Sequence, residues 1–329
     1  MLKTRALRGL AVTGLGFGGS QLGNLYRETS EADARPAVDA AWDGGVRYFD
    51  TAPHYGLGLS ERRLGAALAG RPRDSYVLST KVGRLLERNP APSGSDLLAG
   101  GFAVRDDLRR RFDFGRDGIL RSLESSLSRL GVSRVDIVYV HDPDDHVDQA
   151  IAEAIPALAE LREQGVVGAI GAGMNQWQAL LRMVRETDLD VIMLAGRWTL
   201  LDRSGGKLLA ACAERGVAVV AAAPFNSGLL ARDSPAPDAR FDYEPPPSDV
   251  LASAKAMASI CHRHGTSLPA AALQFPLRHP AVISVVAGMR TADEVRSALS
   301  RIEEPVPDAA WAELRAGTNG EGNASTVDK

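Results

Sequence analysis

Two ionisable side chains, Asp50 and Lys81, stand at the ends of short apolar segments, and a helical pattern over residues 60–68 separates these segments. Such a strand–helix–strand unit makes the two strands parallel neighbours, so both side chains are expected at the same, C-terminal, end of a sheet. Tyr55 follows Asp50 by five residues and falls in the loop over that end. We therefore expect a carboxylate, an ammonium and a phenol to converge there.

This trio suits proton transfer coupled to a redox step. The phenol of Tyr55 alone would be a poor acid or base at neutral pH, because the ordinary pKa of tyrosine is about 10. A neighbouring Lys81 ammonium stabilises the phenolate and lowers this pKa, and a buried Asp50 would keep the ammonium charged and fixed. A phenol tuned in this way can protonate a carbonyl, or deprotonate a hydroxyl, while a hydride moves elsewhere. The alternative is a structural ion pair with a tyrosine nearby.

His141 ends a third apolar segment, at residues 135–140, and would join the same group. Its ring could hydrogen-bond the substrate oxygen and orient it toward Tyr55. A lone histidine after a strand is more often structural, but three ionisable residues at successive strand ends favour the catalytic role. We expect no metal, because His54 and His146 lie in loops without a recognisable ligand spacing.

The remaining chain must supply a scaffold that brings these strand ends together. Eight apolar segments alternate with helical patterns, which predicts an α/β fold of the (β/α)8 TIM barrel type. The predicted strands are residues 10–23, 46–49, 76–80, 135–140, 166–170, 191–194, 217–222 and 283–286. The predicted helices are residues 30–42, 60–69, 117–130, 147–164, 176–186, 206–215, 250–264, 268–278, 291–302 and 308–314.

The alternative fold, a doubly wound open sheet, would need a phosphate-binding fingerprint at its first crossover. Gly14, Gly16 and Gly19 have that spacing, but residues 20–28 do not resemble the start of a helix. We expect instead a barrel strand whose small residues face a ligand. The barrel should be a single domain over residues 1–316, with lid loops at about 84–113 and 224–249 and a frayed tail at 317–329.

Composition excludes several classes of function. A net charge of -3 provides no basic surface for nucleic acid. No apolar run is long enough to span a membrane, and the N-terminus does not resemble a secretory leader. Cys212 and Cys261 are isolated and are expected to be buried thiols, which favours a cytoplasmic protein. The sequence leaves open whether the chain forms a homo-oligomer.

The positions of these residues resemble the aldo-keto reductase family over almost the whole chain. The resemblance implies that Tyr55 is the proton donor or acceptor, that Lys81 and Asp50 tune it, and that His141 positions the substrate oxygen. It also implies NAD or NADP bound across the barrel mouth. The segments that carry it are Phe49-Asp50-Thr51-Ala52-Pro53-His54-Tyr55-Gly56, Ser79-Thr80-Lys81 and His141.

Segments 51–61, 140–144, 172–177 and 194–202 are similar to a narrower branch of that family, the aldose 1-dehydrogenases. This resemblance implies oxidation of the C1 hydroxyl of an aldose, of the L-fucose, D-arabinose or L-galactose type, to the lactone. The proton would pass to Tyr55 as general base and the hydride to the nicotinamide. The alternatives are a pyridoxal 4-dehydrogenase, a reductase of small aldehydes and ketones, and a barrel retained as a binding or channel-regulating subunit.

The chain departs from the family where the cofactor would lie. Gly173-Met174 replaces a frequent Ser-Asn pair, and Ala195 and Ala222 stand where Gln and Tyr are frequent. We expect Asn175 or Gln176 to contact the carboxamide and Phe225 to stack on the nicotinamide. The whole expected set is Asn175, Gln176, Phe225, Asn226, Gly228, Gly288, Arg290 and Glu294.

The same region bears on the choice between the two cofactors. Glu294 would repel the 2′-phosphate of NADP and could accept a hydrogen bond from the 2′-hydroxyl of NAD. NAD is therefore the expected cofactor, although Arg290 could favour NADP. The alternative role of Glu294 is to stabilise the start of a helix.

Four residues are expected at the substrate: His54, Phe102, Arg197 and Trp198. Sugars stack an apolar face on an aromatic ring while polar side chains bind their hydroxyls, so Trp198 and Arg197 suit a sugar. The alternative is that these two residues pack the barrel rim.

Overall fold

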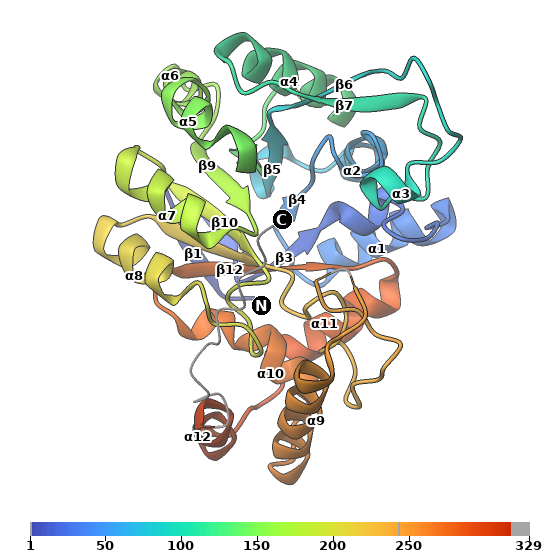
Figure 1. Ribbon diagram of the computed structural model, residues 1–329, viewed down its shortest axis with the longest axis vertical. Coiled ribbons are helices and arrows are strands. Elements are labelled where there is room, and N and C mark those ends of the chain that lie inside the picture. The colour runs from blue at the N-terminus through green and yellow to red at the C-terminus, as the bar shows by residue number, and fades with distance from the viewer. Residues whose placement is uncertain (1, 243, 317–329) are drawn as a thin grey trace.

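The computed structural model describes residues 2–242 and 244–316, and its centre is a closed barrel of parallel strands (Figure 1). Neighbouring barrel strands follow the order of the chain, and the last pairs with the first to close the ring. This confirms the predicted (β/α)8 barrel over the open sheet. The barrel strands are β3 (Leu15–Gly18), β4 (Tyr48–Asp50), β5 (Val77–Val82), β8 (Ile137–His141), β9 (Ala169–Met174), β10 (Val191–Ala195), β11 (Ala218–Ala222) and β12 (Val282–Gly288).

Helices surround the barrel at nearly the predicted places. Ser30 caps α1, because its hydroxyl accepts a hydrogen bond from the Asp33 N–H at 3.1 Å. Position 276 is a proline, which cannot donate to a helical ladder, so the helix predicted to reach 278 ends at Gln274. The main helices are α1 (Glu31–Asp43), α2 (Leu59–Leu68), α4 (Arg116–Leu130), α6 (Ile155–Glu163), α7 (Trp177–Glu186), α8 (Gly206–Arg215), α9 (Ser248–Arg263), α10 (Leu268–Gln274), α11 (Ala292–Glu303) and α12 (Asp308–Ala316).

The helix predicted at 147–164 is interrupted. It consists of α5 (Val147–Gln149), a π-helical turn over Ala150–Ala154, and α6. Strand β9 begins three residues later than predicted and runs on to Met174. Its later half contains Gly171 and Gly173, and glycine is depleted in strands, so the pattern did not reveal it.

An antiparallel hairpin that the sequence did not predict closes the N-terminal end of the barrel. It consists of β1 (Thr4–Leu7) and β2 (Leu10–Thr13), joined by a tight turn with positive φ at Arg8 and Gly9. Leu7 and Val12 of this hairpin pack into the same buried cluster as the inward-facing barrel residues. The single strand predicted at 10–23 is therefore wrong: it is β2, then β3, then a 3-10 turn over Gly19–Gly23.

Two glycines make room for tyrosines inside the barrel. A Cβ on Gly16 would lie 2.8 Å from Cδ1 of Tyr48, and a Cβ on Gly171 would lie 2.9 Å from Cδ1 of Tyr139. Both rings are fully buried. At Gly16 the small residue thus faces a protein side chain, and not the ligand that we expected.

The predicted lid at 84–113 is more ordered than a loop. It contains an antiparallel pair, β6 (Arg84–Arg88) and β7 (Leu108–Phe112), and a short helix α3 (Leu97–Gly100). The second predicted loop, 224–249, ends where α9 begins at Ser248 and includes position 243, which lies outside the described residues. The predicted tail at 317–329 also lies outside them. Within the described ranges, no helix has the length and apolarity needed to cross a membrane.

Candidate active site

Asp50 and Lys81 form a buried ion pair at the C-terminal ends of β4 and β5. The Lys81 Nζ lies 2.6 Å from Oδ2 of Asp50 and also donates to the carbonyl of Thr51 at 3.0 Å. Both side chains are at most 3% exposed. Burial alone would lower the pKa of Lys81, but the charges of Asp50 and Tyr55 and hydrogen bonds to both raise it above its ordinary value. The lysine is therefore an ammonium at all ordinary pH values.

Tyr55 lies against this ammonium, as predicted. The Lys81 Nζ is 4.8 Å from the centre of the Tyr55 ring. Burial raises the pKa of Tyr55 to about 12, while the charge of Lys81 and a hydrogen bond with it lower the pKa. Lys81 thus lowers the pKa of Tyr55 as expected, but the effect of burial is larger and the net pKa is raised. At neutral pH the phenol is protonated, so it is ready to donate a proton, whereas accepting one is favoured by alkaline pH.

His141 completes the predicted group at the end of β8. Its ring is perpendicular to that of Tyr55, with 6.0 Å between the centres. Burial, together with the charges of Arg84 and Lys81, lowers the pKa of His141 well below its ordinary value. The ring is therefore neutral and can donate from one nitrogen and accept at the other.

Two of the predicted substrate residues border this group. The ring of Phe102 lies 5.2 Å from that of His54 and 6.0 Å from that of Tyr55. Phe102 is 2% exposed although it belongs to the lid. The lid therefore supplies an aromatic wall beside the phenol.

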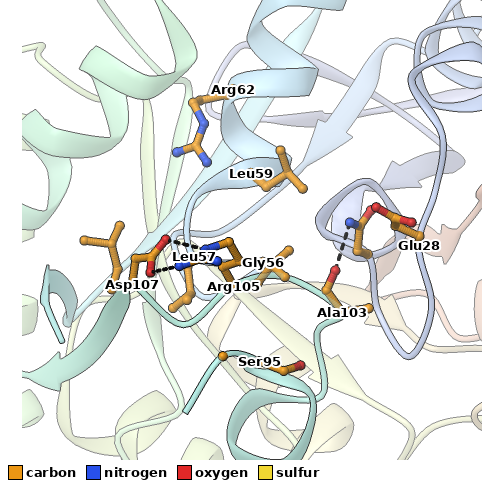
Figure 2. A pocket seen from close by; sticks show the side chains of 13 residues that line it. Glu28, Gly56, Leu57, Leu59, Arg62, Ser95, Ala103, Arg105 and Asp107 are labelled. Carbon is orange, nitrogen blue, oxygen red and sulfur yellow. Dashed lines mark hydrogen bonds and ion pairs between the residues drawn. The ribbon is translucent and has the colours of Figure 1, made fainter. Parts of the chain in front are cut away.

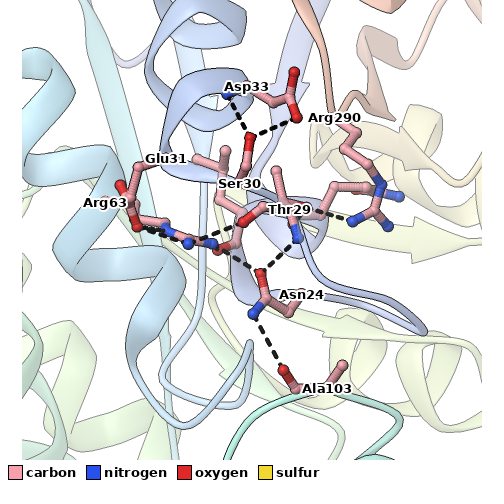
Figure 3. Close-up of polar contacts among 10 residues, drawn as sticks. Asn24, Thr29, Ser30, Glu31, Asp33, Arg63, Ala103 and Arg290 are labelled. Carbon is pink, nitrogen blue, oxygen red and sulfur yellow. Dashed lines mark hydrogen bonds and ion pairs between the residues drawn. The ribbon is translucent and has the colours of Figure 1, made fainter.

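Backbone pairing with the segment after β3 holds this wall in place, and the Asn24 side chain adds a contact to Ala103 of the lid (Figure 3). Leu25 and Phe102 form an antiparallel bridge, and the Tyr26 N–H donates to the Gly101 carbonyl at 2.8 Å. Asn24 connects several elements: its amide donates to the Ala103 carbonyl at 3.1 Å, and its Oδ1 accepts from the Thr29 N–H and from Arg63 of α2.

We expect Asn24→Gly to raise KM severalfold with a smaller change in kcat, because the lid would lose a hydrogen-bonding anchor worth about 1–3 kcal/mol. Glycine tolerates the left-handed backbone at this position, where φ is 67°, so the variant removes the side chain without strain. Steady-state kinetics on the best substrate provide the measurement. Asn89→Ala is the control, since the Asn89 amide bonds within the lid, to the Asp106 carbonyl. Equal effects of both variants would argue against an anchoring role.

The other two predicted substrate residues have protein partners. Arg197 pairs with Asp242 at 2.7 Å and with Asp202 at 3.3 Å. The Trp198 ring lies 5.5 Å from Phe275 and 5.5 Å from His279, beyond the end of α10. These contacts agree with the alternative of rim packing, and a role in substrate binding stays a prediction.

The predicted cofactor residues lie on three turns that follow β9, β11 and β12. Asn175 and Gln176 directly precede α7, and Phe225 is partly buried against the core. Asn226 and Gly228 have positive φ, and Oδ1 of the 2%-exposed Asn226 has no hydrogen-bond partner in the described structure. An orphaned buried acceptor is costly, so a ligand amide at this turn would satisfy it.

In the turn after β12, the charged side chains already have hydrogen-bond partners within the protein. Arg290 is 7% exposed, and its guanidinium donates to the carbonyls of Leu25 and Arg27 and to the Thr29 hydroxyl (Figure 3). Glu294 accepts the Arg290 N–H at 2.6 Å, while Thr291 caps α11. Arg290 therefore anchors the segment after β3. Glu294 accepts a hydrogen bond at the start of α11, which agrees with the alternative role of stabilising the start of that helix.

A polar layer beneath the tetrad of Asp50, Tyr55, Lys81 and His141 was not foreseen. The Ser79 hydroxyl lies 2.7 Å from Oδ1 of Asp50 and 3.2 Å from the Tyr48 hydroxyl, which lies 3.1 Å from that of Tyr139. Residues two apart on a strand share a face. Tyr48, Ser79 and Tyr139 each precede a tetrad residue by two positions, and this spacing is the signal that could have revealed the layer.

A cleft of about 780 Å³ opens beside the site, between the lid, the segment after β3 and the start of α2 (Figure 2). Its described lining includes Gly56, the neighbour of Tyr55, but no residue of the tetrad. Arg105 and Asp107 form an exposed two-bond ion pair there, at 3.0 Å for each bond.

Over residues 2–242 and 244–316, no group of three or more His, Cys, Asp or Glu side chains could hold a metal ion. Cys212 and Cys261 are buried free thiols, as expected.

Comparison with known proteins agrees with this geometry. The model of the Aldo/keto reductase family matches residues 14–318. The chain is 49% identical to D-threo-aldose 1-dehydrogenase from Pseudomonas sp. over 94% of this chain and 95% of that protein. It is 40% identical to pyridoxal 4-dehydrogenase from Microbacterium luteolum, over 94% of each, and 30% identical to L-galactose dehydrogenase from Arabidopsis thaliana, over 92% of this chain and 89% of that one.

Solved structures share the fold. An aldo-keto reductase from Bacillus halodurans, in its holo form, superposes with a TM-score of 0.77 at 27% identity and 96% coverage of both chains. A glycerol dehydrogenase from Gluconobacter oxydans also gives a TM-score of 0.77 but at 20% identity, so it supports the fold alone. The match of the family model and the 49% identity to D-threo-aldose 1-dehydrogenase, with which the arrangement of Asp50, Tyr55, Lys81 and His141 agrees, establish that the chain belongs to the aldo/keto reductase family of oxidoreductases.

Proposed function

We propose that this protein is a nicotinamide-dependent dehydrogenase that oxidises the C1 hydroxyl of an aldose to the lactone. The observation that carries the proposal is the Tyr55 phenol held beside the Lys81 ammonium, 4.8 Å from ring centre to Nζ, with the neutral His141 ring next to it. The sugar class is supported by the 49% identity to D-threo-aldose 1-dehydrogenase and by the match to L-galactose dehydrogenase. The match to pyridoxal 4-dehydrogenase supports the second candidate substrate, pyridoxal.

In this mechanism the chain handles the proton. His141 hydrogen-bonds the C1 oxygen and holds it near Tyr55, whose phenolate form takes the hydroxyl proton. Lys81 stabilises that phenolate, and Asp50 keeps the ammonium in place. A bound nicotinamide cofactor would supply the hydride acceptor. Phe102 and the lid exclude water from the reacting atoms.

For the cofactor we propose that the turns after β9, β11 and β12 hold it, and that it is NAD. The orphaned Oδ1 of Asn226 suits an amide donor. At Gly288 an added Cβ would lie 2.2 Å from Oε1 of Gln21, so a side chain there would have to displace the end of the Gln21 side chain. The Arg290 guanidinium is already bonded to the segment after β3, and Glu294 places a carboxylate at the same turn, which supports NAD over NADP.

The decisive experiment assays both directions with both cofactors. We expect reduction of NAD by L-fucose, D-arabinose or L-galactose at mildly alkaline pH, with a lactone as product and a higher kcat/KM than for pyridoxal. Faster oxidation of NADH by simple aldehydes would favour the reductase alternative. A protein that binds the cofactor but turns over none of these compounds would favour the binding-subunit alternative.

A further inference from the structure

Asp142, the residue after His141, adopts an uncommon backbone conformation. Its φ is +40°, a region that residues other than glycine seldom occupy and that is frequent at functional sites. Its N–H donates to the Gly173 carbonyl at 3.0 Å, which fixes this conformation against the end of β9. The turn directs the carboxylate back toward the histidine ring.

The carboxylate occupies a defined place beside that ring. Its Oδ2 lies 3.4 Å from Nε2 of His141 and accepts a hydrogen bond from the guanidinium of Arg84 at 2.6 Å. The Asp142 side chain is 29% exposed, whereas those of His141 and Arg84 are 7% and 10% exposed. Nδ1 of His141 is buried, so Nε2 is the ring nitrogen that a substrate oxygen can reach.

We propose that Asp142, held by Arg84, is a specificity-determining residue that accepts a hydrogen bond from a hydroxyl on the carbon next to the reacting carbon. The proposal rests on the proposed function, in which Nε2 of His141 binds the reacting oxygen. Oxygens on adjacent carbons of a sugar are separated by about the distance between Nε2 and Oδ2, so one substrate can bond to both groups. The substrate class is therefore a 2-hydroxy carbonyl compound or its cyclic hemiacetal.

The charges around Asp142 suit an acceptor at the pH of the oxidation. Burial raises the pKa of Asp142 to about 6, with Arg84 and Lys81 opposing this shift and Asp144 reinforcing it. Above that pH the group is a carboxylate, which can only accept hydrogen bonds. Arg84 begins β6 and lies over the ring of Phe112 on β7, 5.2 Å from its centre, so the lid hairpin fixes the carboxylate through Arg84. Arg84 is accordingly a positioning residue.

The test compares two substrates that differ only at C2: D-arabinose and 2-deoxy-D-ribose, both oxidised with NAD. For the wild-type protein we expect a ratio of kcat/KM values of about tenfold or more in favour of D-arabinose, because hydrogen bonds to charged groups are strong. Asp142→Gly keeps the positive φ without strain and should bring the ratio close to one. Asp142→Asn, which keeps the shape, should give an intermediate ratio. Retention of the full ratio in Asp142→Gly would overturn the proposal.

Further variants separate recognition from folding. Arg84→Met should lower the ratio and Arg84→Lys should restore part of it, since a purely structural defect would lower both kcat/KM values equally. Asp107→Asn is the matched control: it changes another lid-associated carboxylate, paired with Arg105 but exposed, and should leave the ratio unchanged. If Asp142→Gly does not fold, Asp142→Asn decides: an unchanged ratio contradicts the proposal.

A second substrate pair distinguishes failure of this proposal from failure of the proposed function. If the wild-type protein oxidises neither sugar, the aldose assignment fails, and reduction of 2-hydroxypropanal and propanal then tests Asp142. A preference for 2-hydroxypropanal that Asp142→Asn diminishes supports the inference, and a preference that it leaves intact overturns it. Calorimetric measurement of the affinities for D-arabinose and 2-deoxy-D-ribose tests the preference for a C2 hydroxyl without turnover.

Discussion

Tyr55→Phe is expected to lower kcat for sugar oxidation by about 10²- to 10⁴-fold, the usual contribution of a positioned acid or base. Phenylalanine keeps the ring that packs against Phe102 and His141 but has no hydroxyl to exchange a proton. Folding and cofactor binding should persist, because the ring contacts are retained. Initial rates, together with cofactor binding measured by fluorescence, test this expectation.

Tyr76→Phe is a suitable control for that variant. Tyr76 packs against Trp42 and Phe49, with ring centres 6.0 and 6.1 Å away, in the core cluster that also contains residues of the surrounding helices. The same chemical change there should leave kcat nearly unchanged. A Tyr55→Phe variant with wild-type turnover would exclude Tyr55 as the proton-transfer group.

Lys81→Met should damage both activity and stability, and the two effects have separate causes. Loss of the cation removes stabilisation of the Tyr55 phenolate, so the pKa of Tyr55 should rise further and the alkaline limb of the oxidation profile should move to higher pH. The variant also leaves the carboxylate of Asp50 buried without its partner, which costs about 3–5 kcal/mol in similar cases. Denaturant unfolding and a pH–rate profile measure the two effects.

The double variant Lys81→Met/Asp50→Asn separates the two roles of the pair. Removing the buried charge along with its partner should restore much of the free energy of unfolding, because asparagine can still accept from the Ser79 hydroxyl. Activity should not return, since the cation is still missing. Recovery of activity in the double variant would show that Lys81 acts on catalysis only through stability.

The sequence predicted those parts of the site that lie at strand ends. Asp50, Lys81 and His141 could be placed because residues at the C-terminal ends of parallel strands converge whatever the details of the loops. Tyr55 could be placed because it lies only five residues after Asp50, in the loop that follows β4. The contribution of burial to its pKa was not predictable, since it depends on how the lid residue Phe102 packs against the ring.

Contacts between distant segments could not be predicted. Arg84 bonds to Asp142, 58 positions away in the chain, and Arg290 bonds to Leu25, 265 positions away. No local sequence pattern encodes such pairings. The hairpin at residues 4–13 was missed for a different, local reason. Its strands are only four residues each and run directly into β3, so their alternation could not be separated from that of the barrel strand.

That hairpin covers the end of the barrel opposite the catalytic group. Leu7 and Val12 pack at the end opposite the catalytic group, in the same buried cluster as Tyr48 and Tyr139. We therefore expect a proton taken up by Tyr55 to return to bulk water on the side from which the substrate arrives. Substrate entry and proton release are then expected to share one route.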